Sequence, residues 1–182
     1  MTRIIGGALG GRTIRAPSGS GTRPTSDRVR EALFSALGSR GAIEGAAVLD
    51  LYAGSGALGL EAVSRGAASV TFVESERRAA AHIGANVRAL GVEQARIVPS
   101  TVAAFLARAA GTAYDLVLLD PPYPLGEDDL AHVLSLLSDV LAEDAVVVVE
   151  RSSRSPEPRW PDGLVREGHR VYGETVIWYA IH

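Results

Sequence analysis

Short apolar runs alternate with longer amphipathic segments from residue 46 onward. The runs are rich in Val, Leu and Ala and are bounded by glycine, proline or acidic residues, as in strands that are buried on both faces of a parallel sheet. The segments between them have helical length, and Gly66 and Gly91 follow two of them as expected stops. We expect strands at residues 46–52, 69–73, 95–98, 116–119 and 145–149, and helices at 57–65, 76–90, 101–110 and 128–141.

The C-terminal region predicts an antiparallel pairing. Residues 163–172 and 174–181 form two extended segments separated by Gly173, which suits the turn of a hairpin. With these two segments the pattern predicts an α/β fold with a mostly parallel seven-stranded sheet, helices on both faces and an antiparallel C-terminal hairpin.

The N-terminal region precedes this repeating pattern. Residues 3–17 read as two short strands around Gly10-Gly11, a pair that permits a tight turn, and residues 18–21 read as a flexible linker. An isolated hairpin is only marginally stable, so we expect this one to become ordered on packing or binding. We divide the chain into a basic hairpin with its linker at residues 1–21 and a main domain at residues 22–182.

A helix opens the main domain. Ser26 or Asp27 can cap its first turn, and Gly38 is the expected stop. Its apolar positions share one face because they follow helical spacing, and they are Val29, Ala32, Leu33, Ala36 and Leu37.

The composition excludes several classes of protein. The chain has no cysteine, which removes disulfides, thiolate metal sites and a cysteine nucleophile. No apolar run approaches the roughly 20 residues of a membrane span, and the N-terminus lacks the apolar core of a signal peptide. The four histidines show no metal-ligand spacing, so we expect no metal site. We expect a cytoplasmic monomer without a membrane partner.

Charge divides the chain into two unequal parts. All 18 basic residues are arginine; residues 1–40 hold seven of them against two acids, whereas residues 41–182 hold eleven against nineteen. A basic segment on an acidic body is typical of contact with nucleic acid, and an arginine-rich solvated surface is the alternative. The candidate phosphate contacts are Arg3, Arg12, Arg15, Arg23, Arg28 and Arg30.

The first candidate site follows the strand at residues 46–52. Gly54, Gly56 and Gly59 match the G-x-G-x-x-G pattern between a strand and a helix, where glycines permit a tight turn and close approach to a ligand. Glu74 ends the next strand, near the position expected for a carboxylate that binds ribose hydroxyls. These residues predict an adenosine-containing cofactor and leave its chemical class open.

The second candidate site follows the strand at residues 116–119. That strand ends in Asp120-Pro121-Pro122-Tyr123, and the prolines cannot continue a ladder because they lack N–H donors. A carboxylate, a rigid turn and an aromatic ring therefore come at the carboxyl end of a core strand, where α/β sheets bind ligands. A plain strand-ending turn is the alternative interpretation.

In combination these motifs resemble the class I S-adenosylmethionine-dependent methyltransferases, which have a Rossmann-like fold. The motif D-L-Y-A-G-S-G at residues 50–56, the acidic end of the second strand and D-P-P-Y after the fourth carry the resemblance. In that family [DNS]-P-P-[YFW] is associated with methylation of planar nitrogens, chiefly the exocyclic amines of bases. Such an amine is a poor nucleophile because its lone pair is delocalised into the ring.

The N-terminal region narrows the resemblance. The stretch T-R-P-T-S-D-R-V-R-E-A-L-F at residues 22–34 is similar to the R-P-T-x-D-x-x-R-E-x-L-F signature of the RsmD family, and the opening R-I-I-G-G resembles that family's hairpin. The resemblance implies methyl transfer from S-adenosylmethionine to the N2 amine of guanine 966 in bacterial 16S ribosomal RNA. We expect the RNA to be presented within a small-subunit ribosomal particle.

The resemblance also assigns roles to site residues. Asp120 and the Pro121 carbonyl would accept hydrogen bonds from the N–H groups of the amine. Pro122 would complete the rigid motif, and Tyr123 would stack on a flipped base. Many relatives place an acidic residue near the adenine amine after the third strand, where this chain has Pro99-Ser100-Thr101 and a hydroxyl or carbonyl would have to serve. The implied cofactor residues are Asp50, Tyr52, Gly54, Ser55, Gly56, Glu74, Ser75 and Thr101.

Three other functions stay open. A DNA adenine-N6 methyltransferase can carry the same four-residue motif, but the chain has no evident target-recognition domain. A protein-glutamine methyltransferase also has to methylate a nitrogen whose lone pair is delocalised, in this case that of an amide. The basic charge of residues 1–40 counts against this function. A non-catalytic RNA-binding module would not need an intact Asp120 and Tyr123.

Overall fold

The computed structural model describes residues 2–15 and 26–182. The predicted linker at residues 18–21, the boundary between residues 21 and 22, and Arg23 lie outside the described residues. None of the helices in the described part is long and apolar enough to cross a membrane.

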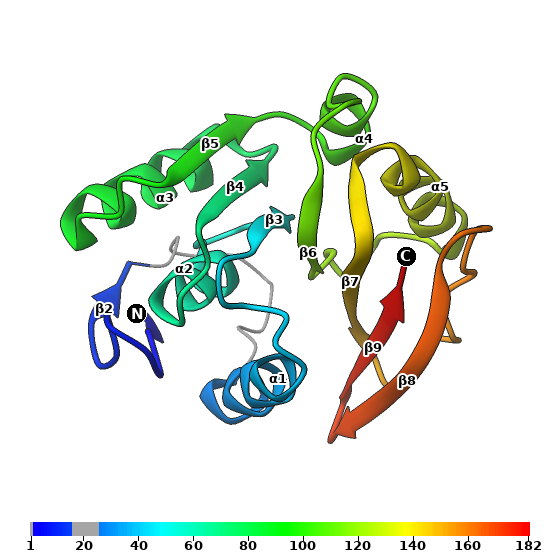
Figure 1. The fold of residues 1–182 in the computed structure, drawn as a ribbon, viewed down its shortest axis with the longest axis horizontal. Coiled ribbons are helices and arrows are strands. Elements are labelled where there is room, and N and C mark those ends of the chain that lie inside the picture. Colours follow the sequence, from blue (N-terminus) through cyan, green and yellow to red (C-terminus); the bar gives the residue numbers. More distant parts are fainter. Residues whose placement is uncertain (1, 16–25) are drawn as a thin grey trace.

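A seven-stranded sheet runs through the molecule in the order β5-β4-β3-β6-β7-β9-β8 (Figure 1). The first five strands in this order are parallel, and β9 and β8 add to β7 as an antiparallel pair, which confirms the predicted fold class. Gly173 has a φ of 62° in the turn between the last two strands. The strands are β3 (Ala47–Leu51), β4 (Ser69–Glu74), β5 (Ala95–Pro99), β6 (Tyr114–Leu119), β7 (Leu141–Ser152), β8 (Val165–Tyr172) and β9 (Thr175–Ile181).

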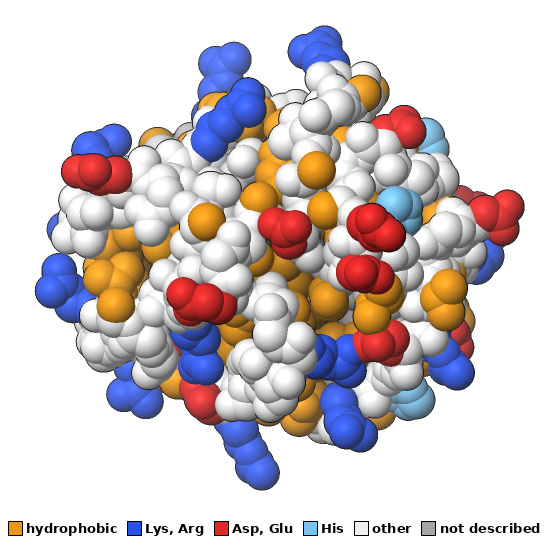
Figure 2. Space-filling view, viewed as in Figure 1, with side chains coloured by type: hydrophobic (Ala, Val, Ile, Leu, Met, Phe, Trp, Pro, Cys, Tyr) orange, Lys and Arg blue, Asp and Glu red, His pale blue; other side chains and the backbone are white. Residues whose placement is uncertain are grey.

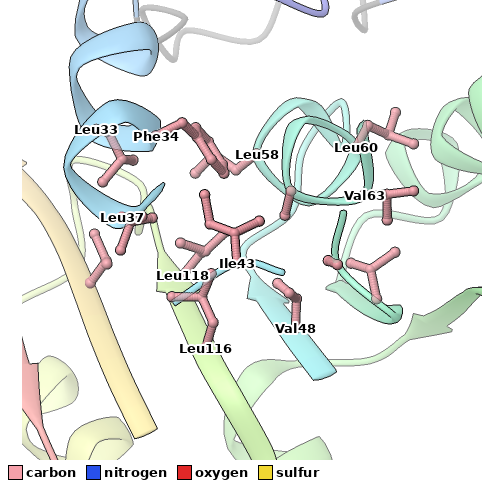
Figure 3. Packing of buried hydrophobic residues seen from close by; sticks show 14 of the residues in the cluster. Leu33, Phe34, Leu37, Ile43, Val48, Leu58, Leu60, Val63, Leu116 and Leu118 are labelled. Atoms are coloured by element: carbon pink, nitrogen blue, oxygen red, sulfur yellow. The ribbon is translucent and has the colours of Figure 1, made fainter. Parts of the chain in front are cut away.

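Helices cover both faces of the sheet because alternate residues of each central strand point to opposite faces. Leu116 and Leu118 pack into one hydrophobic cluster with α1 and α2, as Figure 3 shows. Val117 and Leu119 pack into a second cluster with α4 and α5. The helices are α1 (Asp27–Ser39), α2 (Ala57–Ser64), α3 (Arg77–Leu90), α4 (Val102–Leu106) and α5 (Glu127–Leu137), followed by a 3-10 turn at Ser138–Val140.

Three helix ends differ from the predicted ones by more than one residue, and one of them is the end of α4, which stops at Leu106 rather than at residue 110. The first helix passes through Gly38 to Ser39, and Gly41 instead takes the positive φ, 68°, after the helix. The predicted helix at residues 128–141 ends earlier, because β7 is twelve residues long and begins at Leu141. That strand pairs with β6 from its first residue, across an irregularity that includes Asp144 at a φ of 60°. Chain pairing therefore overrides the local helical pattern there.

The N-terminal hairpin is wider than predicted and is docked on the main domain. Its strands are β1 (Thr2–Arg3) and β2 (Thr13–Ile14), and of the predicted Gly10-Gly11 turn only Gly11 has a positive φ. Ile4 and Ile14 are buried in the same cluster as α1 and α2, and the hairpin lies beside α2 in Figure 1. The hairpin thus shares a hydrophobic cluster with the main domain.

A buried carboxylate that the sequence analysis did not single out holds the hairpin in place. Glu61 on α2 has no exposed surface and accepts hydrogen bonds from the backbone N–H groups of Ile5 at 2.7 Å and Gly6 at 2.9 Å. It also accepts one from Arg65 Nε at 2.7 Å, and Arg30 Nε lies 4.0 Å from it. Glu61 therefore satisfies backbone donors that hairpin pairing leaves open.

Candidate active site

A cavity of about 1060 Å³ opens at the carboxyl ends of the parallel strands. The ends of β3, β4 and β6, the first turns of α4 and α5 and the N-terminal hairpin all contribute to its lining. In Figure 2 acidic side chains lie toward the centre of the face shown, and most arginine side chains project around its outline. The cavity brings together most of the predicted site residues, namely Asp50, Tyr52, Gly54, Ser55, Glu74, Ser75, Thr101, Asp120 and Pro122.

The loop after β3 has a backbone that glycine makes possible. Gly54 and Gly56 have φ values of 56° and 79°, in the left-handed region that favours glycine. A Cβ on Gly56 would also lie 3.3 Å from atoms of Phe72 and Ile83, so this glycine lets the loop sit close to the core. Tyr52 has a φ of 61°, a conformation that costs a non-glycine residue about 1–3 kcal/mol and often accompanies function.

Glu74 holds this loop from the end of the neighbouring strand. Its Oε2 accepts a hydrogen bond from Gly54 N at 2.8 Å, and its Oε1 accepts one from Glu76 N at 2.8 Å. An ionised carboxylate has about four acceptor positions, so each oxygen can still accept a bond from a ribose hydroxyl. The geometry fits the predicted ribose role and adds a structural one.

Asp50 gives the cavity its most buried acidic group. It is 1% exposed, and its Oδ2 accepts a hydrogen bond from Gly59 N at 2.9 Å. Burial raises the pKa of Asp50 well above its usual value; the Gly59 bond opposes this shift, and the charges of Asp120 and Glu74 add to it. The carboxylates of Asp120 and Glu74, which act on Asp50 in this way, give the cavity a negative potential that favours a positively charged ligand group, such as a sulfonium.

The Asp120–Tyr123 motif stands where β6 leaves the sheet. Asp120 is half-buried and Pro121 buried, whereas Tyr123 is 61% exposed and lies outside the cavity lining. The turn closes with a hydrogen bond from Leu125 N to the Pro122 carbonyl at 2.9 Å. An exposed aromatic side chain beside a cavity is available for stacking, so its position is compatible with the predicted role.

Thr101 has a structural task in addition to the predicted one. Its Oγ1 accepts a hydrogen bond from Ala104 N at 3.3 Å and so caps α4. The hydroxyl can still donate one hydrogen bond, so contact with an adenine ring stays a prediction.

Three residues of α5 line the cavity, and none of them was among the predicted site residues. Asp129 and His132 lie three positions apart on this helix, and with Val133 they form one face toward the cavity. Asp129 also helps to raise the pKa of Tyr52 to about 12, where burial is the larger cause. Asp129 reads in the sequence as an ordinary acid of a helix start, and the spacing to His132 is the signal that could have distinguished it.

Arg30 is a correction to the predicted phosphate contacts. It is 2% exposed, and its guanidinium donates hydrogen bonds to Thr2 Oγ1 at 3.2 Å, the Arg3 carbonyl at 2.6 Å and Asp27 Oδ1 at 3.0 Å. These bonds from the terminal nitrogens join α1 to β1. Arg30 is therefore part of the folded interior rather than an open phosphate contact.

The other predicted arginines differ in their surroundings. Arg3 lines the cavity and pairs with Asp27 at 3.0 Å. Arg12, Arg15 and Arg28 are exposed, lie outside the cavity lining, and form no ion pair with a carboxylate of residues 2–15 or 26–182. Charge on these three side chains is thus open to an anionic partner.

Comparison with known proteins gives a consistent result. A model of the family described as "Conserved hypothetical protein 95" matches residues 2–181. Ribosomal RNA small subunit methyltransferase D of Escherichia coli strain K12 is 40% identical over 175 residues, which cover 95% of this chain and 86% of that protein. The putative rRNA methyltransferase YlbH of Bacillus subtilis strain 168 is 34% identical and covers 96% of each chain.

A solved structure extends the agreement to three dimensions. The putative methyltransferase yhhF from Escherichia coli matches with a TM-score of 0.88 at 38% identity, over 100% of this chain and 97% of that one. The similarity therefore includes the N-terminal hairpin as well as the seven-stranded sheet.

Proposed function

Since this chain belongs to the RsmD family of S-adenosylmethionine-dependent ribosomal RNA methyltransferases, we propose that it methylates the exocyclic N2 amine of a guanine in 16S ribosomal RNA. The target by resemblance is guanine 966. The observation that carries the proposal is the position of Asp120 and Pro122 in the same cavity as the glycine loop and Glu74. An amine held at the motif would therefore be next to the bound cofactor.

The cofactor residues fit S-adenosylmethionine. Glu74 would bind the ribose hydroxyls, and the loop at Gly54–Gly56 would lie against the methionine part. Asp50 would offer its carboxyl group to the cationic end of the cofactor, whose charge would oppose the burial that raises the pKa of Asp50. When bound, S-adenosylmethionine supplies a methyl group on a good leaving group, so positioning of the amine limits the reaction.

The Asp120–Tyr123 motif would prepare the amine. Asp120 and the Pro121 carbonyl accept hydrogen bonds from the two N–H groups of the amine. These bonds favour a pyramidal nitrogen whose lone pair is free to attack the methyl group. Asp120 can take up the released proton, and the ring of Tyr123 holds the flipped base by stacking. Removal of one group that acts electrostatically in this way typically lowers kcat by about 10²–10³-fold.

The arm, which is the N-terminal hairpin, and the start of α1 would hold the RNA backbone. Arg3, Arg12, Arg15 and Arg28 bind phosphates, which positions the substrate without reading its sequence. We place the reaction in the cytoplasm, with a monomer acting on a small-subunit particle.

The test supplies labelled S-adenosylmethionine and small-subunit particles from a strain that lacks this enzyme. The expected product is one N2-methylguanine, mapped in 16S RNA by mass spectrometry of nuclease fragments. Asp120→Ala should lower the rate at least about 100-fold and leave affinity for S-adenosylhomocysteine within about threefold. Label in DNA or protein with none in ribosomal RNA would overturn the function, and an active Asp120→Ala variant would overturn the role of Asp120.

A further inference from the structure

One buried amide joins the N-terminal hairpin to the glycine loop. Asn86 lies on α3 and is 3% exposed. Its Nδ2 donates hydrogen bonds to the Arg15 carbonyl at 2.9 Å and to the Ser55 carbonyl at 3.1 Å, and its Oδ1 accepts one from Arg15 N at 2.9 Å. Both N–H groups and the oxygen are thus used, two bonds toward the arm and one toward the loop.

On the loop side, Asn86 completes a clamp around the cofactor segment. Ser55 lies between Gly54 and Gly56, and Gly54 is itself held by Glu74. Side chains from β4 and α3 therefore fix two consecutive residues of a segment that glycines leave flexible. If the Asn86 bond is lost, the loop keeps its hydrogen bond to Glu74 on β4 but loses the hydrogen bond that Asn86 donates from α3.

On the arm side, the hydrogen bonds of Asn86 within the described residues go to the backbone of Arg15. The guanidinium of Arg15 is exposed and forms no ion pair with the described carboxylates, so it is open to a phosphate. A phosphate that binds the Arg15 guanidinium and shifts this residue would also shift its backbone N–H and carbonyl groups, which are hydrogen-bonded to Asn86. Because a buried amide is costly to leave without partners, a shift of Arg15 must move Asn86 or break its bonds.

We propose that Asn86 is a positioning residue that couples the seating of the N-terminal arm to the shape of the cofactor loop. The RNA half of this inference rests on the proposed function. The coupling is reciprocal: RNA on the arm raises the affinity for the cofactor, and the cofactor raises the affinity for RNA by the same factor.

The first experiment needs no RNA. Calorimetric titration with S-adenosylhomocysteine compares the wild-type protein with Asn86→Ala and with Ser64→Ala as a matched control. Ser64 is also 3% exposed and also anchors the hairpin, through Leu9 N and the Gly6 carbonyl, but neither of these side-chain hydrogen bonds reaches the glycine loop. We expect Asn86→Ala to weaken binding at least about fivefold, and Ser64→Ala to stay within about twofold of wild type.

Two results would overturn the loop role. One is wild-type affinity in Asn86→Ala, and the other is an equal loss in Ser64→Ala, which would indicate general loosening of the hairpin. Thermal unfolding of both variants provides the stability reference. In turnover, a positioning role predicts a raised KM for S-adenosylmethionine with a smaller change in kcat.

The second experiment repeats the titration in the presence of small-subunit particles from a strain that lacks this enzyme. The particles should tighten S-adenosylhomocysteine binding to the wild type and to Ser64→Ala, and should leave the affinity of Asn86→Ala unchanged. An equal effect on all three proteins, or none on the wild type, would overturn the coupling. If the wild type neither binds nor methylates RNA, the proposed function and the coupling fail together, while the RNA-free titration still decides the loop role.

Discussion

The carboxylate of Asp50 and the backbone N–H of Gly59 are joined by a 2.9 Å hydrogen bond between the first core strand and the first turns of α2. A Cβ on Gly59 would lie 3.0 Å from that carboxylate and 2.4 Å from Phe72, so a side chain there would disturb both the bond and the core. The third glycine of the motif thus serves close packing of strand and helix. This arrangement leaves the carboxyl group of Asp50 buried near the charges of Asp120 and Glu74.

This burial predicts a pH dependence of stability. The pKa of Asp50 is raised in the folded protein above its unfolded value of about 3.9. Above that pH the folded state binds more protons than the unfolded state, so the contribution of Asp50 to stability falls as pH rises toward its folded pKa. We expect Asp50→Asn to gain stability relative to wild type from pH 4 to pH 8, measured by urea unfolding. A difference that is constant with pH would contradict this.

Glu61 should be the most sensitive acidic position for stability. It accepts two backbone bonds from the hairpin, pairs with Arg65 and lies near the buried Arg30. Glu61→Ala leaves those donors without an acceptor and should lower the free energy of unfolding by about 3–5 kcal/mol.

The control for this prediction is Glu31→Ala. Glu31 also pairs with Arg65, but its side chain is 47% exposed, so its loss should cost at most about 1 kcal/mol. Equal losses in the two variants, measured by chemical denaturation, would show that burial of Glu61 is not the cause.

Tyr123 should affect activity without affecting stability. The side chain is 61% exposed, so Tyr123→Ala should leave the melting temperature unchanged. Stacking on a base is worth about 1–3 kcal/mol, which corresponds to a loss of about 5–150-fold in kcat/KM for RNA. Tyr123→Phe keeps the ring and should keep most of the activity. Similar activity in the Ala and Phe variants would argue against stacking.

Arg12 and Arg15 should contribute to RNA affinity through charge. Each phosphate contact adds about 0.7–0.9 to the slope of log affinity against log salt, so Arg12→Ala with Arg15→Ala should reduce that slope by about 1.5. Arg154→Ala with Arg159→Ala removes the same charge from residues that pair with Glu174 and Asp128, and should leave the slope unchanged. Filter binding over a salt series measures both, and equal slopes in the two double variants would refute the arm's role.

Local patterns were sufficient to predict the order of the strands along the chain and the glycine loop between β3 and α2. Apolar runs of strand length, Gly91 as a helix stop and Gly173 in a turn each act through their immediate neighbours, and each is found as expected. The strand ends also placed Glu74 and Asp120 at one edge of the sheet, because parallel strands share a carboxyl edge.

Long-range partners account for what the sequence did not predict. Arg30 was predicted to bind phosphate because its actual partners are distant in the sequence. They are Thr2 and the carbonyl of Arg3, which are 28 and 27 residues away. Glu61 and Asn86 looked like ordinary helix residues for the same reason, since their hairpin partners lie 55 to 71 residues away. Their burial depends on how the hairpin docks, which no local pattern encodes.

The docking of the hairpin also has a consequence for the order of assembly during synthesis. Ile5 and Leu9 are made before the groups that bind them, on Glu61 and Ser64, which follow 56 and 55 residues later. These contacts of the hairpin therefore cannot form until α2 has left the ribosome, and they close only across a long loop. The hairpin is thus completed after β3 and α2, which follow it in the sequence.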